Sequence, residues 1–292
     1  MPATVKEILA KHTVKDSVFT HLFGDPVYTL ELYKALHPED TAVTVSDITL
    51  MTIENIMTVQ PYNDLGFLVG DRLLVFVECQ STWTPNILVR LLLYVAQTIQ
   101  QYIEQTKQNV FSSCKIALPE PELYVIYLGE RDNKPDVLTL SNVFFEGRKT
   151  AIDLTAKIIY DGQQGDIISQ YIGFTKIYNE QVKFYGRTQK AVLETIRICK
   201  DKNFLKEYLQ NRETEVKDIM MTIFSAERAM EARLMDAEAA GEIRGKEEQA
   251  RETALTMSKD GLPTSVIAKY IHVNEATVKE WLQAAAVYLG KD

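Results

Sequence analysis

Residues 64–80 read DLGFLVGDRLLVFVECQ, and this stretch decides the fold prediction. Its two apolar runs have the length of strands and flank Gly70-Asp71, a residue pair typical of a tight turn. Upstream, residues 46–58 (SDITLMTIENIMT) alternate apolar and polar positions and are rich in β-branched side chains. The three segments predict three consecutive antiparallel strands that form a meander.

Helical patterns flank this meander on both sides. Before it, residues 16–36 repeat apolar side chains at spacings of three and four around a break at Gly24-Asp25-Pro26, which predicts two helices. After it, residues 86–108 keep this periodicity without a break, and Pro85 suits the first turn of a helix. One long helix is therefore expected after the meander.

Further apolar runs of strand length follow that helix, PELYVIYLG at residues 121–129 and AIDLTAKIIYDG at residues 151–162. Residues 164–200 then predict helices with a joint at Gly186. The order helix, three strands, helix, strand predicts an α+β fold with a mixed sheet and an α-helical C-terminal region.

The apolar residues between Leu205 and Met230 follow alternating steps of three and four, interrupted by Arg212. This pattern is typical of a coiled-coil dimer seam, but a helix packed on its own domain would show it as well. In a seam, the Arg212 guanidinium would have to reach solvent or pair with an acid of the partner chain, such as Glu213 or Glu215.

The end of the chain is also helical in pattern. The charge-rich residues 238–252 (EAAGEIRGKEEQARE) contain two glycines and predict a linker. Beyond them, three short helical patterns resemble a helix-turn-helix, with Thr264 and Asn274 as helix caps and Val278 and Trp281 facing inward. The predicted parts are a main domain at 13–200, a long helix or coiled coil with a linker at 201–250, and a helix-turn-helix-like segment at 251–292.

Composition limits the class of protein. Of the 292 residues 46% are apolar, which is typical of a globular chain without a membrane span. The net charge of −8 argues against a protein coated in nucleic acid, although a local basic groove is compatible with it. Three cysteines far apart in sequence and an N-terminus without the apolar core of a signal peptide favour the reducing cytoplasm.

Several catalytic motifs are absent from the sequence: H-E-x-x-H, the phosphate-binding G-x-x-x-x-G-K-[ST], G-x-G-x-x-G and G-x-S-x-G. What remains is a set of polar residues on two predicted strands. Alternation puts Glu78 and Gln80 on one face of their strand and Cys79 on the other. If the hairpin pairs Leu65–Val69 with Leu74–Glu78, Asp64 and Glu78 come near each other at one end of the sheet, where a cation such as Mg²⁺ would relieve their repulsion.

This arrangement resembles the PD-(D/E)XK nuclease superfamily, and within it the bacterial recombination-promoting nuclease (Rpn) and PD-(D/E)XK transposase-like group. The motifs that carry the resemblance are D-S-V-F at 16–19, Y-N-D-L-G-F-L-V at 62–69 and V-E-C-Q-S at 77–81, followed by Arg90 and Tyr94 on the next helix. The resemblance extends over residues 13 to 235. It implies a restriction-endonuclease-like core.

The resemblance also implies roles for single residues. Asp64 and Glu78 would bind Mg²⁺ or Mn²⁺ together with the backbone carbonyl of Cys79. Gln80 stands where the superfamily has a catalytic lysine, so an amide that can only orient water replaces a positive charge. Asp16 would have a supporting role, since Thr20 occupies a position at which relatives commonly have lysine.

DNA contacts are expected from Arg90 and Tyr94, which share a helix face with Gln97, and from Lys279 at the start of the last helix. A polar stripe on a helix can also simply face solvent. The C-terminal segment has five basic and five acidic residues, so it is equally suited to packing or oligomerisation.

The function that these observations predict is a metal-dependent DNA endonuclease that hydrolyses phosphodiester bonds. The resemblance links it to DNA recombination or mobile-element biology, with DNA and a second copy of the chain, as a homodimer, for partners. One alternative is a catalytically silent DNA-binding or regulatory protein that uses the C-terminal helices. Another is a purely oligomeric scaffold.

Overall fold

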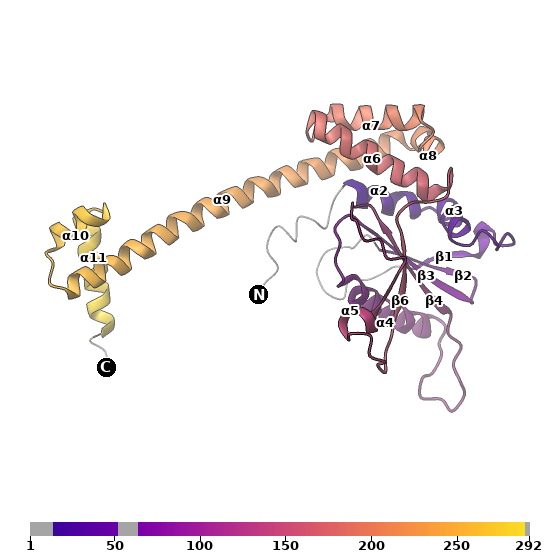
Figure 1. The fold of residues 1–292 in the computed structure, drawn as a ribbon, viewed down its shortest axis with the longest axis horizontal. Helices are drawn as coiled ribbons and strands as arrows, with labels where there is room; N and C mark the ends of the chain where they lie inside the picture. Colours follow the sequence, from indigo (N-terminus) through magenta and orange to yellow (C-terminus); the bar gives the residue numbers. More distant parts are fainter. Residues whose placement is uncertain (1–13, 52–63, 290–292) are drawn as a thin grey trace. The chain divides into compact units, whose positions relative to one another are not determined.

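The computed structural model describes residues 14–51 and 64–289. The chain divides into two compact units, Met1–Ala226 and Glu227–Asp292, and one helix, α9 (Glu213–Lys259), crosses the division (Figure 1). Among the described residues, no helix combines the length and the apolar character needed to cross a membrane.

Within the described residues, the first unit is built on a mixed sheet of six strands in the order β1-β2-β3-β4-β6-β5. The predicted meander is confirmed, because β1 and β3 each pair with β2 in antiparallel fashion. The β3-β4 and β4-β6 pairs are parallel, and β5 is antiparallel to β6. The strands are β1 (Ile48–Met51), β2 (Asp64–Val69), β3 (Leu73–Gln80), β4 (Glu120–Tyr127), β5 (Val137–Thr139) and β6 (Thr155–Ile159).

Helices cover both faces of this sheet, as Figure 1 shows. Alternation along β3 sends Val75 and Val77 into the cluster under α2, α3, α6 and α7, and Leu74 and Phe76 into the cluster under α4. The helices of this unit that lie before α9 are α2 (Val14–Phe23), α3 (Pro26–Leu36), the short 3-10 helix η1 (Val45–Asp47), α4 (Ile87–Gln105), α5 (Leu140–Phe144), α6 (Ile167–Tyr185), α7 (Gln189–Asp201) and α8 (Lys206–Asn211).

Most predicted elements are present. The break at Gly24-Asp25-Pro26 separates α2 from α3, and the Asp25 side chain caps α3 by accepting from the Val27 N–H (3.0 Å). Gly186 ends α6 with φ +67°, a conformation that favours glycine. The sequence analysis missed β5 and α5, which are too short to show a clear periodicity.

The first apolar residues of the pattern that begins at Leu205 pack against their own domain. Leu205, Leu209 and Val216 are each at most 2% exposed and pack in the core cluster of the first unit. The helix is also interrupted between α8 and α9, and Leu205 has a left-handed backbone with φ +50°. A continuous coiled-coil seam that begins at Leu205 is therefore wrong, because these side chains already have partners in their own domain.

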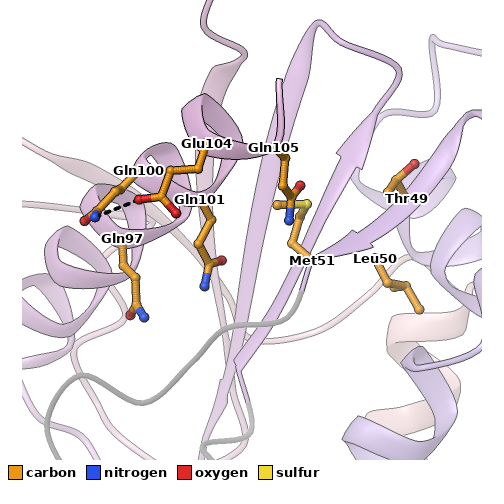
Figure 2. A pocket seen from close by; sticks show the side chains of 8 residues that line it. All are labelled: Thr49, Leu50, Met51, Gln97, Gln100, Gln101, Glu104 and Gln105. Atoms are coloured by element: carbon orange, nitrogen blue, oxygen red, sulfur yellow. Dashed lines mark hydrogen bonds between the residues drawn. The ribbon is translucent and has the colours of Figure 1, made fainter. Parts of the chain in front are cut away.

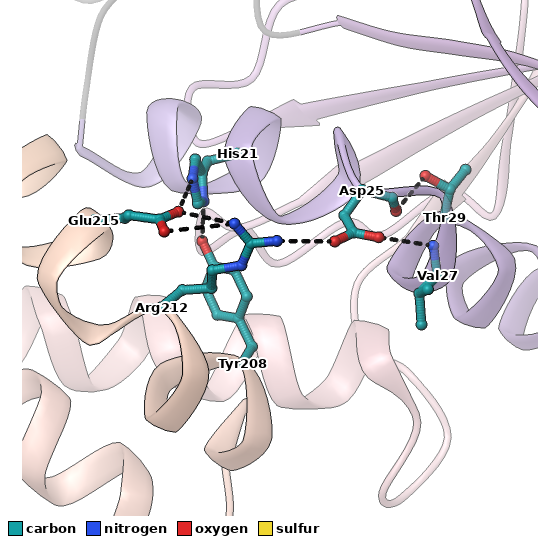
Figure 3. Close-up of polar contacts among 7 residues, drawn as sticks. All are labelled: His21, Asp25, Val27, Thr29, Tyr208, Arg212 and Glu215. Carbon is teal, nitrogen blue, oxygen red and sulfur yellow. Dashed lines mark hydrogen bonds and ion pairs between the residues drawn. The ribbon is translucent and has the colours of Figure 1, made fainter.

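Arg212 lies at this interruption and finds acids within its own chain. Its guanidinium is 3.1 Å from Glu215 and 3.4 Å from Asp25, as Figure 3 shows. His21 joins the same network through Tyr208 (2.7 Å) and Glu215 (3.1 Å). The expected ion pair with an acid of a partner chain is thus replaced by pairs that tie the start of α9 to α2 and α3.

The second unit has a small core of its own. The end of α9 packs with α10 (Thr264–Ile271) and α11 (Glu275–Leu289) around Ala254, Ile267 and Val278, and Trp281 packs against them. The Asn274 side chain accepts from the Ala276 N–H (2.9 Å), so the predicted cap is confirmed.

Two predictions for this region are wrong. Pro263 is the N-cap of α10, and the hydroxyl of Thr264 bonds to Glu275 instead (3.1 Å). The linker expected at Gly241 and Gly245 is part of α9, because alanine and charged residues around these glycines favour helix enough to offset their cost of about 1 kcal/mol each.

Candidate functional site

The hairpin register places the two candidate metal-binding acids directly opposite each other. Asp64 pairs with Glu78, and the ladder continues from Leu65 opposite Val77 to Val69 opposite Leu73. The turn between the strands begins at Gly70, whose φ of +57° explains why glycine stands there. Residues opposite each other in an antiparallel pair have Cβ atoms about 5 Å apart, close enough for two carboxylates to share a cation.

The same register assigns the site to one face of the sheet. Positions 64, 78 and 80 alternate in phase with Leu68, Leu74 and Phe76, which pack in the cluster under α4. Cys79 belongs to the opposite cluster, where it is 6% exposed and its thiol donates to the Tyr171 hydroxyl (3.6 Å). Gln80, at the carboxyl end of β3, therefore belongs to the α4 side of the sheet.

Gln80 is the candidate side chain that the structure describes in most detail. It is half-buried, and its amide nitrogen donates a hydrogen bond to the backbone carbonyl of Thr82. This contact orients the amide just beyond the end of β3 and leaves one N–H and the Oε1 atom for other partners.

The α4 residues expected to contact DNA have different surroundings. Arg90 is half-buried on the helix that covers the candidate face. Tyr94 is only 4% exposed and packs in the core cluster under α4, so the prediction that its ring contacts DNA is wrong. The alternative that Arg90, Tyr94 and Gln97 form a solvent-facing stripe is also contradicted at Tyr94, because this side chain packs in the core between α4 and the sheet.

Farther along α4 the structure has a polar hollow of about 670 Å³ against the edge strand β1. Glutamines line the helix side, while β1 contributes its last three residues, Thr49 to Met51 (Figure 2). The buried Oε1 of Gln97 has no hydrogen-bond partner among the described residues. The hollow therefore offers amide donors and acceptors, and Glu104 is the one charged residue among the described residues that line it.

The remaining candidate positions belong to helices α2 and α11. Asp16 is in α2, whose buried residues belong to the cluster on the other side of the sheet, and its supporting role stays a prediction. Lys279 pairs with Glu275 one turn earlier in α11 (3.0 Å). Hydrogen bonds from Lys279 and Thr264 lower the pKa of Glu275, so a carboxylate accompanies the lysine that was expected to contact DNA.

The donor set at the hairpin end fits a divalent cation such as Mg²⁺ or Mn²⁺. Two opposed carboxylates supply the hard oxygen ligands that these ions prefer, and like charges directly opposite each other would otherwise destabilise the strand pair. The structure does not describe the side chains of Asp64 and Glu78. Among the side chains that it does describe, no group of three or more histidine, cysteine or acidic residues is placed to hold a metal ion. Ligation by the Cys79 carbonyl stays a prediction.

The sequence analysis overlooked the residues just beyond the hairpin end. Arg131 and Lys134 lie in the loop after β4 and line a cavity that Ser81 also borders. A signal was present in the charged stretch GERDNKPD at 129–136, which directly follows a predicted strand. The sequence alone does not show that this stretch lies near Ser81, because that position depends on β4 pairing with β3.

Comparisons with known proteins give no family assignment: the chain matches no family model, no curated protein and no solved structure.

Proposed function

We propose that this protein is a metal-dependent DNA endonuclease of the PD-(D/E)XK type, related to the Rpn and transposase-like group. The observation that supports this most is the pairing of Asp64 with Glu78 in the hairpin, with Gln80 two residues farther along the same strand. The α+β fold with its mixed sheet is compatible with the restriction-endonuclease-like core that the proposal requires.

In this proposal Asp64 and Glu78 hold the cation. When bound, a divalent metal lowers the pKa of a water molecule and neutralises charge on the scissile phosphate. The chain's own contribution is to keep the two carboxylates in register and to aim the Gln80 amide. Thr82 accepts one N–H of the Gln80 amide, so the other N–H and Oε1 remain to orient the attacking water through a hydrogen bond.

The role of Gln80 leads to a prediction about rate. Gln80→Ala should lower the cleavage rate by about 10- to 100-fold with little change in Mg²⁺ affinity, because an orienting group is lost but no metal ligand. Gln80→Lys should keep or raise activity, since it restores the positive charge of the superfamily. Single-turnover cleavage of a labelled duplex at several Mg²⁺ concentrations measures both quantities.

Gln210→Ala, at an exposed position in α8, is the matched control and should cleave at the wild-type rate. If Gln80→Lys folds and binds Mg²⁺ but does not cleave, the amide has a task other than orienting water.

A homodimer remains part of the proposal, because one site per chain cuts two antiparallel strands most simply as a two-fold pair. Light scattering at micromolar concentration should give twice the chain mass of 33.2 kDa. A monomer that makes double-strand breaks at a rate independent of protein concentration would contradict this prediction.

One observation favours the alternative of a DNA-binding regulator. The second unit has its own three-helix core, and α11 is capped as the second helix of a helix-turn-helix would be. Under this alternative, Lys279→Ala should weaken duplex binding and reduce its salt dependence, while Mg²⁺ should produce no cutting. Mg²⁺-dependent cutting that is lost with Asp64 or Glu78 would exclude a catalytically silent protein.

A further inference from the structure

A cavity of about 830 Å³ opens at the carboxyl ends of the parallel strands β3, β4 and β6. Ser81, which directly follows Gln80, borders it, and the Leu128 N–H donates to the Gln80 carbonyl (2.8 Å) at the same place. Ligands of open α/β sheets bind in crevices outside the carboxyl ends of strands. The cavity therefore adjoins the end of the strand that carries the candidate site.

Aromatic rings form a row beside this cavity. Trp83 lies edge-to-face against Tyr127 at 5.4 Å, and Tyr127 lies in the same way against Tyr160 at 5.9 Å. Tyr127 and Tyr160 line the cavity. Tyr127 is only 5% exposed and packs in the core cluster under α4, so Tyr160, which is half-buried, is the ring of this row that a base can reach from the cavity.

Two cations are placed on this row. The Arg131 guanidinium lies 3.5 Å from the centre of the Trp83 ring, and the Lys134 ammonium lies 5.4 Å from that of Tyr160. The Arg131 Nε and Nη1 atoms are buried and have no hydrogen-bond partner among the described residues. A charged group that is buried with unused donors is costly unless a partner of opposite charge arrives.

Carboxylates in the same lining limit which ligand fits. Asp161 pairs with Lys176 (3.6 Å), while Glu130, Asp132 and Glu180 are exposed to solvent. The described lining thus has three basic and four acidic residues, so a small free anion would gain little from it. A ligand that combines phosphates with stacking rings gains from both the cations and the aromatic row.

We propose that this cavity binds a short stretch of a DNA strand next to the scissile bond, with phosphates on Arg131 and Lys134 and a base against the half-buried Tyr160 ring. The choice of DNA as ligand rests on the proposed nuclease function. The assignment makes the loop after β4 the part of the chain that positions the strand relative to Gln80.

Binding is tested in EDTA, where no metal-dependent cleavage can occur. The full chain is titrated against a fluorescently labelled single-stranded oligonucleotide, and Kd is measured by anisotropy at several salt concentrations. The double variant Arg131→Ala/Lys134→Ala should bind about tenfold more weakly. Its plot of log Kd against log salt should be flatter by about 1.4, because each phosphate of a single strand that a cation neutralises adds about 0.7 to the slope.

Controls separate the cavity from other cationic surfaces. Arg148→Ala, an exposed arginine outside this lining, should leave Kd within about twofold of the wild-type value, since exposed charges contribute little. Arg131→Gln removes the charge but keeps more of the side chain than alanine does, and it guards against a double variant that fails to fold. Trp281→Phe leaves Trp83 as the one tryptophan of the two in the chain, and its fluorescence should change when the oligonucleotide binds.

Several outcomes would overturn this inference: unchanged binding and salt slope in both cavity variants, Trp83 fluorescence that does not respond to the oligonucleotide, or inorganic phosphate that competes as well as a nucleotide of the strand. If oligonucleotide binding depends on Arg131 but the protein cuts no DNA with Mg²⁺, the proposed nuclease function is refuted while the cavity stays supported as a binding site. If the double variant cuts DNA with an unchanged KM, the nuclease function is supported and the cavity is refuted as the site that binds the strand.

Discussion

Asp64→Ala and Glu78→Ala should each lower Mg²⁺-dependent nicking by about 10³-fold or more, since several kcal/mol of transition-state stabilisation depend on the bound metal and each 1.36 kcal/mol is a factor of ten. The two residues are opposite each other in the β2-β3 ladder, so each substitution removes one of two adjoining charged ligands. The loss should appear as a relaxed fraction of supercoiled plasmid that no longer grows with time.

The same variants make a second, opposite prediction for stability. Two carboxylates directly across an antiparallel pair repel each other when no cation is bound, so removing either one should leave the metal-free protein at least as stable as the wild type. Added Mg²⁺ should raise Tm for the wild type but not for either variant, because binding to the folded state alone stabilises it. Thermal unfolding with and without Mg²⁺ measures this.

Asp71→Ala provides the matched control. Asp71 is an exposed acid in the turn of the same hairpin, at the opposite end from Asp64 and Glu78. It should retain both cleavage and the Mg²⁺-dependent rise in Tm. Cleavage that persists in Asp64→Ala and in Glu78→Ala would remove these two residues as metal ligands and with them the proposed mechanism.

Phe224→Ala should destabilise the first unit by about 3–5 kcal/mol, the usual cost of removing a buried phenylalanine ring. Phe224 is fully buried, stacks on Tyr178 of α6 at 6.2 Å and shares its cluster with Val216 and Met220. The expected measurement is a lower midpoint of urea unfolding with an unchanged m value.

Met235→Ala is the control for this prediction, because the Met235 side chain lies farther along the same helix and is 70% exposed. It should change stability by no more than about 0.5 kcal/mol. Equal effects of the two substitutions would mean that the start of α9 does not belong to the core of the first unit. The result also decides where a fragment should end, since one that stops at residue 200 lacks Val216, Met220 and Phe224.

Much of the fold follows from local patterns in the sequence. Alternation within residues 64–80 is a property of each strand, and Gly70-Asp71 restricts how two adjacent strands can join, so the hairpin itself could be predicted. The predicted pairing of residues 65–69 with 74–78 is one residue off, because the structure pairs Leu65 with Val77 and Val69 with Leu73. The periodicity of α4 and the break between α2 and α3 are equally local. The opposition of Asp64 and Glu78 belongs to this class, because only thirteen residues separate them and a single turn connects them.

Tertiary structure decided the rest, because the same pattern can be buried against several partners. The apolar steps that begin at Leu205 suit a dimer seam or a domain core, and only the position of α6 and α7 shows that they fill a core. Arg212 pairs with Asp25, which is far away in sequence, and Tyr94 is buried because α4 lies on the sheet. The cavity beside Gln80 exists because β4 and β6 lie in parallel next to β3, a long-range arrangement that no local periodicity encodes.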